Sequence, residues 1–166
     1  MIKVIAFDVF GTVFDLSQVE RNEVRTYIQH IKQSEWSPLK LPKHWETLPA
    51  HADSKEGIEM LRKDYTVVTC SNGPLGLLTK LSKHNNISWD AIIPLELNKV
   101  FKPNHKAYLT VCEVLDVAPE EVLMVTANEK FGDLEAAKEV GMSSILIRDD
   151  KLSTIIDLAN YLKNNQ

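Results

Sequence analysis

Two kinds of hydrophobic pattern alternate along the chain. Short runs of β-branched and aromatic residues, typical of strands buried on both faces, are followed by segments in which apolar residues recur every three or four positions, as on one side of a helix. The predicted strands are residues 2–8, 65–70, 91–94, 122–126 and 144–147. The predicted helices are residues 16–32, a helix that follows Asp53, and residues 75–83, 104–117, 133–140 and 153–163. This order predicts an α/β fold with a parallel five-stranded sheet, right-handed crossovers and helices on both faces.

Residues 34–52 interrupt this regular pattern. Three prolines lie in the stretch, so it cannot form one continuous helix. It also carries Trp36 and Trp45, and we expect a folded excursion whose indole rings pack on the main body. The regular pattern then resumes, and Asp53 with Glu56 has the spacing of a capping box for the next helix.

Composition limits the classes of function. A chain of 166 residues is long enough for one domain with one core, and we interpret residues 1–166 as a single domain. The net charge of −4 and the dispersed basic residues favour neither a nucleic-acid partner nor an anionic membrane. Cys70 and Cys112 are too few for a disulfide framework or a zinc site, and the start of the chain lacks the pattern of a secretory signal. We therefore expect a soluble, cytoplasmic protein with reduced thiols.

Polar side chains follow four of the predicted strands, at the point where each strand ends. They are Asp8 after the first strand, Ser71 and Asn72 after the second, Lys102 in the loop after the third, and Thr126 and Asn128 after the fourth, with Asp133 close behind. Parallel sheets bind ligands just beyond the carboxyl ends of their strands, so these side chains should converge. Two carboxylates, a lysine, a hydroxyl and amides at one place would suit a covalent or electrophilic reaction.

The same residues resemble the motifs of the haloacid dehalogenase (HAD) superfamily of aspartate-nucleophile hydrolases. The motifs occur in order as DVFGT from Asp8, CSNG around Ser71, FKPNHKAY around Lys102 and TANEKFGDLEAAKEVG around Asp133. The resemblance spans the chain except residues 16–50. It implies a HAD-type Rossmann-like three-layer sandwich in which residues 16–50 form a small cap insertion.

Most members of that superfamily resemble Mg-dependent phosphatases, and the chain departs from them at two positions. Phe10 stands where they carry a second aspartate, and Ala127 stands where they carry an acidic metal ligand. Magnesium would lose a hard oxygen ligand, and Phe10 cannot protonate an alkoxide leaving group. The chain is more similar to the L-2-haloacid dehalogenases, which have an aromatic residue at the first of these positions and whose halide leaving group needs no proton.

The resemblance to L-2-haloacid dehalogenases implies metal-independent hydrolytic dehalogenation of a small 2-haloalkanoic acid, with no cofactor. Asp8 would attack the α-carbon and form an aspartyl ester, which water would then hydrolyse. Lys102 would keep Asp8 ionised, because a nearby opposite charge favours the charged form. Asp133 would activate the water.

Substrate-binding roles follow from the same resemblance. Ser71 and Thr12 would bind the substrate carboxylate, and Asn72 is a candidate donor to the halide. Phe10 would line an apolar pocket for the halide. Arg25, within EVRTYIQ, is the candidate for the arginine that the cap of these enzymes supplies to the halide.

Positioning roles complete the set. Asn128 would support Asp133, while Tyr108 and Thr126 would position Lys102 and Asp133. Two residues are inserted between Asn128 and Asp133 relative to the dehalogenase pattern.

The short cap leaves alternatives open, because residues 16–50 are far fewer than the cap of the dehalogenases. A Mg-dependent phosphatase of the same superfamily would share Asp8, Lys102 and Asp133 and would require Mg. A catalytically inactive protein would keep the fold for binding. The expected partner is a small anionic substrate, and the sequence leaves open whether the chain is a monomer or a homodimer.

Overall fold

A four-stranded parallel sheet forms the centre of the molecule. The computed structural model describes residues 1–165. The strands are β1 (Val4–Phe7), β2 (Thr66–Thr69), β3 (Val122–Thr126) and β4 (Ser143–Leu146), in the spatial order β2-β1-β3-β4. The α-helices are α1 (Arg21–Ile31), α2 (Ser54–Arg62), α3 (Leu75–His84), α4 (His105–Leu115), α5 (Asp133–Glu139) and α6 (Ile155–Asn164). Three short 3-10 helices are η1 (Lys43–Thr47), η2 (Leu95–Asn98) and η3 (Pro119–Glu121).

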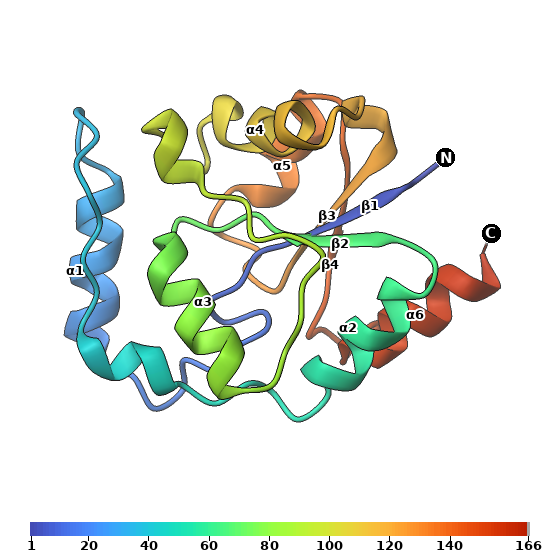
Figure 1. Cartoon of the computed structure of the whole chain (residues 1–166), viewed down its shortest axis with the longest axis horizontal. Coiled ribbons are helices and arrows are strands. Elements are labelled where there is room, and N and C mark those ends of the chain that lie inside the picture. Colours follow the sequence, from blue (N-terminus) through green and yellow to red (C-terminus); the bar gives the residue numbers. More distant parts are fainter. Residues whose placement is uncertain (166) are drawn as a thin grey trace.

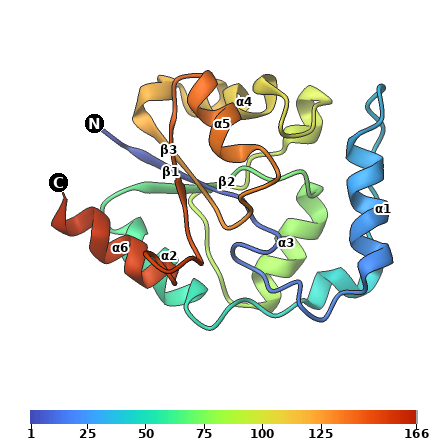
Figure 2. The ribbon, with the colours of Figure 1, turned by 180° about the vertical axis from the view of Figure 1, so that it is seen from behind.

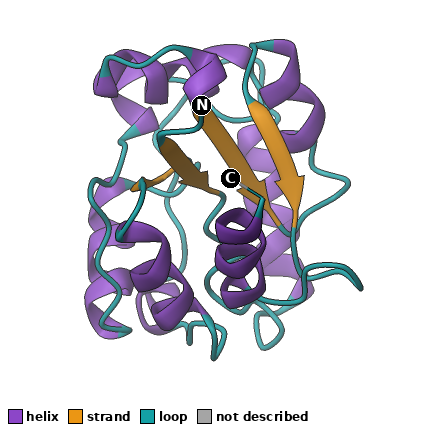
Figure 3. Cartoon of the chain, turned by 90° about the vertical axis from the view of Figure 1, so that its right-hand side faces the viewer, coloured by secondary structure: helices purple, strands orange, loops and turns teal. Residues whose placement is uncertain are grey.

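Helices cover both faces of this sheet. α4 and α5 pack on one face, whereas α2, α3 and α6 pack on the other (Figure 1 and Figure 2). Figure 3 shows the strands between these two helix layers. The predicted Rossmann-like α/β fold with a parallel sheet is thus confirmed. Within residues 1–165, no helix is both long and apolar enough to cross a membrane.

α1 belongs to neither helix layer. It stands beside α3, beyond the carboxyl ends of the strands (Figure 1). It begins at Arg21, later than the predicted start at residue 16. α1 and η1 are the helices of the segment 16–50, so this segment lies at the edge of the sheet to which the polar strand ends were assigned.

β1 contributes to two separate halves of the core. Ile5 and Phe7 belong to the hydrophobic cluster that includes residues of α2, α3 and α6, whereas Val4 and Ala6 belong to the cluster that includes residues of α4 and α5. All four side chains are buried. Successive side chains of a strand point to opposite faces, so a central strand covered on both sides must be apolar at every position.

The prediction of a fifth strand is wrong. Residues 91–94 contribute only an isolated parallel bridge between Ala91 and Val68 of β2. The next ladder position is taken by a side chain, because the Ile93 N–H donates to the hydroxyl of Thr69 at 3.0 Å. The proline that follows has no N–H to donate. The segment therefore runs beside β2 without continuing the ladder.

The segment before β2 contains one confirmed and one wrong expectation. Trp45 is fully buried and Trp36 stacks on Phe101, so both indoles pack on the main body as predicted. The capping box is wrong, because the Asp53 side chain makes no cap bond. Its carboxylate instead pairs with the guanidinium of Arg148, at 2.9 Å between Oδ1 and Nη1. This pair ties the start of α2 to the loop after β4.

The register of the sheet aligns the carboxyl ends of neighbouring strands. Phe7 pairs with Thr69 of β2 on one side and with Val125 of β3 on the other. Asp8, directly after β1, and Thr126, the last residue of β3, therefore lie side by side at the same edge of the sheet. The Asp8 N–H donates to the Val125 carbonyl at 2.9 Å, which extends the ladder by one residue. The strand ends thus converge as the sequence predicted.

Gly57 of α2 lies where this helix crosses α6. A Cβ at this position would lie 2.5 Å from Cγ2 of Ile155, so the two helices must move apart to admit a side chain. We expect Gly57→Ala to lower the free energy of unfolding by about 1–3 kcal/mol, because overpacking forces backbone shifts. Gly76→Ala in α3 is the matched control, since no atom lies within 4 Å of its Cβ position. That variant should keep or raise the stability by up to about 1 kcal/mol in urea unfolding. Equal losses in both variants would contradict the crossing argument.

Candidate active site

Lys102 lies between two carboxylates at the carboxyl edge of the sheet. Its Nζ is 3.0 Å from Oδ1 of Asp8 and 3.1 Å from Oδ2 of Asp133. The side chains of Lys102 and Asp133 are 1% and 0% exposed, whereas that of Asp8 is 14% exposed. The sequence predicted all three as site residues, and the fold brings them into contact. Asp8 is the member of this trio that an incoming molecule can reach.

Two threonines hold the second oxygen of Asp8. Oδ2 accepts hydrogen bonds from Thr12 Oγ1 at 2.9 Å and from Thr126 Oγ1 at 3.2 Å. The Thr12 hydroxyl itself accepts from the Ala127 N–H, and the Thr126 hydroxyl accepts from the Asn128 N–H. Both hydroxyls are therefore oriented toward Asp8. This differs from the prediction, in which Thr12 would bind a substrate carboxylate and Thr126 would position the other charged residues.

Asp133 is buried at the start of α5. Gly132 precedes it with a φ of +111°, a conformation that glycine adopts without strain, and this turns the chain into the helix. Oδ1 of Asp133 accepts a hydrogen bond from the hydroxyl of Tyr108, which is fully buried on α4. Tyr108 thus packs in the core and fixes the carboxylate that also contacts Lys102.

Asn72 holds the main chain of Lys102 at two points. Its Oδ1 accepts from the Lys102 N–H at 2.7 Å, and its Nδ2 donates to the Lys102 carbonyl at 3.2 Å. The Asn72 side chain is buried, so water does not compete for these bonds. The sequence suggested a halide donor at this position, and the structure instead places the amide where it fixes the direction of the lysine side chain.

Ser71 and Phe10 pack at the same edge. Ser71 is 1% exposed, and its Oγ accepts from the Gly73 N–H at 3.1 Å. The Phe10 ring meets the Trp45 ring edge to face, with 5.3 Å between centroids. A Cβ at Gly73 would lie 2.8 Å from the Phe10 ring, which is too close. The turn formed by residues 71–73 therefore needs glycine at this position while Phe10 keeps its place.

Burial and charge shift the pKa values at this edge. Burial raises the pKa of Asp8 above its ordinary value, while Lys102 opposes this shift and Asp133 adds to it. Burial alone would lower the pKa of Lys102, but Asp133 and Asp8 raise it well above its ordinary value. Lys102 therefore stays protonated at neutral pH. Burial also raises the pKa of the Cys70 thiol to about 12, so this thiol stays neutral and is no competing nucleophile.

The structure does not bring Arg25 to the cluster. Arg25 is exposed on α1. It lies two residues before Tyr27, which places it about 200° around the helix from the face that meets Phe10, at 100° per residue. Helical geometry thus directs Arg25 away from the Phe10 side of α1, and its role at the halide stays a prediction.

Asn128 is also away from its predicted partner. The residue is exposed, and its Oδ1 accepts from the Lys130 N–H two residues on, as in a turn. The inserted residues let the loop close on itself, so Asn128 does not support Asp133 through its side chain. Tyr108 supplies that hydrogen bond instead.

Two aromatic residues near the cluster were not predicted. Nζ of Lys102 lies 5.7 Å from the ring centroid of Phe131, in the loop before α5. The Tyr27 ring from α1 lies 6.1 Å from the Phe10 ring. In the sequence, Tyr27 shares a helical spacing with Val24, which indicates packing and gives no sign of a position at a site.

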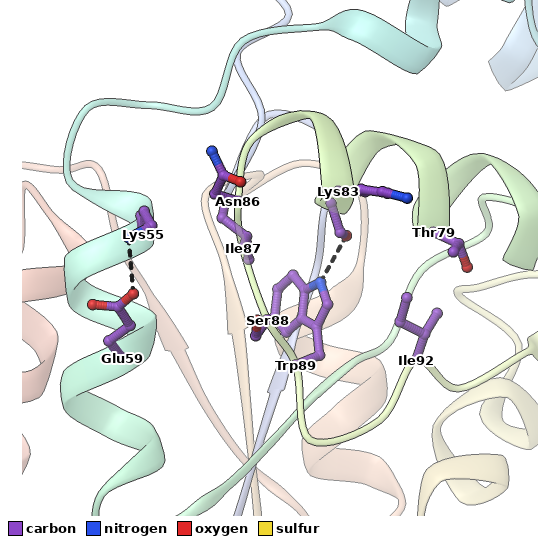
Figure 4. A pocket seen from close by; sticks show the side chains of 10 residues that line it. Lys55, Glu59, Thr79, Lys83, Asn86, Ile87, Ser88, Trp89 and Ile92 are labelled. Atoms are coloured by element: carbon purple, nitrogen blue, oxygen red, sulfur yellow. Dashed lines mark hydrogen bonds and ion pairs between the residues drawn. The ribbon is translucent and has the colours of Figure 1, made fainter.

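Two cavities differ in their relation to Asp8. A cavity of about 380 Å³ adjoins the loop after β1 and is lined by Phe10, Gly11, Leu16 and residues 127–130. A cavity of about 660 Å³ lies between α2 and α3 and shares no residue with the charged cluster. Figure 4 shows Trp89 in this second cavity and the Lys55–Glu59 ion pair at its side. The first cavity is therefore the candidate approach to Asp8.

Comparisons with known proteins point to one group of enzymes. No family model matches the chain. The chain is 27% identical over 189 aligned residues to (S)-2-haloacid dehalogenase of Xanthobacter autotrophicus, covering 86% of this chain and 74% of that protein. It is 28% identical to (S)-2-haloacid dehalogenase 4A of Burkholderia cepacia, over 75% of this chain and 53% of that protein. The chain thus spans about half of the length of this second relative.

A solved structure of an L-2-haloacid dehalogenase has a similar fold. The L-2-haloacid dehalogenase of Xanthobacter autotrophicus with covalently bound chloropropionic acid superposes with a TM-score of 0.70. The sequence identity is 24%, and the match covers 100% of this chain and 84% of that chain. The two chains therefore share their fold.

Replacing Lys102 by methionine should leave Asp8 and Asp133 without their shared cation. We expect Lys102→Met to lower the free energy of unfolding at pH 7 by about 3–5 kcal/mol, because a buried charge loses its partner. Without the ammonium, the pKa of a buried carboxyl rises above its unfolded value, so the loss should shrink as the pH falls from 7 to 5. Urea unfolding at both pH values measures this. Lys80→Met, which removes an exposed lysine paired with Glu46, is the control and should change little. A loss that is the same at both pH values would contradict the role of carboxylate charge.

Proposed function

We propose that this chain, which is L-2-haloacid dehalogenase-like over most of its length, removes the halide from a small 2-haloalkanoic acid through an aspartyl ester on Asp8. The observation that carries the proposal is the contact of the buried Lys102 ammonium with two carboxylates, Asp8 and Asp133. One carboxylate is accessible and can attack, and the other is buried and can take up a proton. The covalent adduct of the structurally similar enzyme supports this chemistry.

The reaction has two steps. In the first, an oxygen of Asp8 attacks the α-carbon in line with the carbon–halogen bond, and the halide leaves with the bonding electron pair. In the second, water attacks the carbonyl carbon of the Asp8 ester, and Asp133 takes up its proton. The bond between the carbonyl carbon and the alkyl oxygen then breaks, and that oxygen takes the proton back from Asp133. A 2-hydroxy acid is released, and Asp8 loses the proton of its new hydroxyl to solvent and returns to the carboxylate. The first step inverts the α-carbon and the second leaves its configuration unchanged.

Lys102 acts in both steps. Before the attack, its charge favours the ionised form of Asp8 against the effect of burial. During ester hydrolysis, negative charge develops on the carbonyl oxygen of the ester. That oxygen is held by Lys102 if it is Oδ1 and by the two threonine hydroxyls if it is Oδ2. A donor is therefore in place for either oxygen, without reorganisation during the reaction.

The surroundings of Asp8 suit a substrate that loses a halide better than they suit a phosphate ester. Phe10, two residues after Asp8, offers an apolar ring and no proton. Lys102 occupies one oxygen of each carboxylate, and hydroxyl groups already donate to the other two, so a divalent cation would have to compete with these donors. Ala127 adds no carboxylate to compensate. No observation in the structure favours the phosphatase alternative over the dehalogenase.

Residues 16–50 are proposed as a reduced cap within a single domain. α1 stands beyond the carboxyl ends of the strands, where a lid over Asp8 would be. Trp45 of η1 is fully buried, so the segment is anchored by its own aromatic residue. Its small size leaves the site more open to water than a full cap would, which weakens the electrostatic gain of a dry site.

Halide release tests the proposal directly. We expect the chain to release chloride or bromide from chloroacetate, bromoacetate or one enantiomer of 2-chloropropionate in the presence of EDTA. Asp8→Asn should reduce the rate by at least about 10³-fold, because the nucleophile is removed. The matched control is Asp64→Asn, at an exposed aspartate, which should keep the wild-type rate. Activity that needs added Mg, or that survives in Asp8→Asn, would refute the proposal.

The pH dependence tests the ionisation of Asp8. Asp8 must be ionised to attack, so ester formation should be lost as the pH falls through its pKa, which burial raises above the ordinary value of 3.8. In Asp133→Asn a negative charge that raises this pKa is removed, so the acid limb of ester formation should move to lower pH. Single-turnover mass spectrometry of the Asp8 adduct, repeated across the pH range, measures this acid limb in the wild type and in the variant. A limb that moves to higher pH in the variant would contradict the electrostatic account.

A further inference from the structure

Three consecutive backbone carbonyls in the loop after Asp8, those of residues 11–13, are each held by a side chain from another part of the chain. The bonds run from Nε2 of His51 to Gly11 at 3.0 Å, from Nη2 of Arg148 to Thr12 at 2.9 Å and from the hydroxyl of Ser54 to Val13 at 2.8 Å. Thr12 and Val13 are fully buried and lie outside the strands. Buried carbonyls need donors, so these side chains determine the shape of the loop.

Arg148 holds the middle carbonyl of this loop with two N–H groups. Nε and Nη2 donate to the Thr12 carbonyl at 3.0 and 2.9 Å, while Nη1 and Nη2 donate to the two carboxylate oxygens of Asp53 at 2.9 and 3.2 Å. Burial would raise the pKa of Asp53, but hydrogen bonds from Arg148 and from the Ile155 N–H lower it below its ordinary value. The carboxylate is therefore ionised at neutral pH. The planar guanidinium thus joins two fixed groups, a geometry that the single ammonium of a lysine does not provide.

The backbone of Arg148 has a conformation that favours glycine. Its φ is +64°, in the left-handed region that residues with a side chain adopt infrequently. Its N–H donates to the Leu152 carbonyl at 2.7 Å and closes a turn after β4. A residue kept in such a conformation points to a function of its side chain. The contacts of this side chain lead to the loop after Asp8.

Thr12 transmits the position of this loop to Asp8. Its hydroxyl donates to Oδ2 of Asp8 at 2.9 Å and accepts from the Ala127 N–H at 2.8 Å. A threonine side chain has two heavy atoms on Cβ and few rotamers, so it cannot compensate for a shift of its own backbone. A displacement of the Thr12 carbonyl would therefore also move the hydroxyl away from Asp8.

We propose that Arg148 is a positioning residue of the reaction, which fixes the loop after β1 so that the Thr12 hydroxyl stays on the attacking carboxylate. The inference rests on the function proposed above. Attack on the α-carbon requires a carboxylate oxygen in line with the carbon–halogen bond, and a misplacement of about 1 Å costs about 100-fold in rate. Lys102 holds Oδ1 and Thr12 holds Oδ2, so the two contacts together set the plane of the Asp8 carboxylate. Arg148 acts through Thr12 and needs no contact with the substrate.

Arg148→Gly tests this role, because glycine adopts the left-handed backbone at this position without strain. We expect the rate of ester formation with chloroacetate to fall about 10- to 100-fold. The hydrogen bond from Thr12 lowers the pKa of Asp8, so its loss should also move the acid limb of ester formation to higher pH, with Lys102 and Asp133 still in place. Single-turnover mass spectrometry of the Asp8 adduct measures both effects. An unchanged rate or an unchanged acid limb would overturn the proposal.

A double-mutant cycle shows whether Arg148 acts through the Thr12 hydroxyl. In the Thr12→Val background, Arg148→Gly should change the rate of ester formation by no more than about 2-fold, because the contact that it positions is already absent. Equal fold losses in both backgrounds would indicate a general structural effect and would overturn the proposal. Arg62→Ala is the control, since this arginine pairs with Asp90 away from the loop, and it should leave the rate unchanged.

Crystal structures separate this inference from the proposed function. If the wild type forms no ester with any haloacid, the proposed function fails, and the distance from Thr12 Oγ1 to Asp8 Oδ2 alone decides the role of Arg148. In Arg148→Gly this distance should exceed about 3.5 Å, so that the hydrogen bond is lost. An unchanged contact would overturn the positioning role, whatever the activity. If Arg148→Gly does not fold because Asp53 is unpaired, the double variant with Asp53→Asn replaces it in every measurement.

Discussion

A buried ammonium must have partners, and this constraint determines the arrangement around Lys102. An unpaired charge in the interior costs several kcal/mol, so the lysine can be buried only where two carboxylates meet it. The three residues lie directly after β1, in the loop before α4 and at the start of α5. Each of these elements must therefore reach its final position before the charge is compensated. The site and the packing of the sheet are consequently parts of one cooperative structure.

The fold was predictable to the extent that it depends on local pattern. β1 is apolar at every position and β3 at every position before Thr126, because each is covered on both faces, and this is visible in the sequence. The segment 91–94 is apolar as well, yet its ladder is interrupted where the Ile93 N–H donates to the Thr69 hydroxyl. That contact depends on a side chain of another strand. The predicted capping box of Asp53 is wrong for the same reason, since the Asp53 carboxylate pairs with Arg148, a residue distant in the sequence.

The site was predictable where chemistry alone selects the residue. Asp8, Lys102 and Asp133 were predicted from the order of the motifs and from positions at or near the ends of predicted strands. The roles of the neutral residues depend on which acceptor each donor meets, and this is decided by distances that the sequence does not contain. Asn72 holds the Lys102 backbone, and Thr12 holds Asp8. Tyr27 carried no signal at all, because its spacing is that of ordinary packing.

The net charge of Lys102, Asp8 and Asp133 changes in the course of the proposed reaction. Lys102 with Asp8 and Asp133 has a net charge of −1, and esterification of Asp8 reduces the protein part to a neutral pair. The halide then leaves a site that holds no surplus negative charge of its own. Hydrolysis restores the Asp8 carboxylate next to the hydroxy-acid anion, and like charges at short range repel strongly where water is scarce. Attraction for an anion is therefore weaker after the second step than in the ester state, and the charge of the restored Asp8 favours departure of the hydroxy acid.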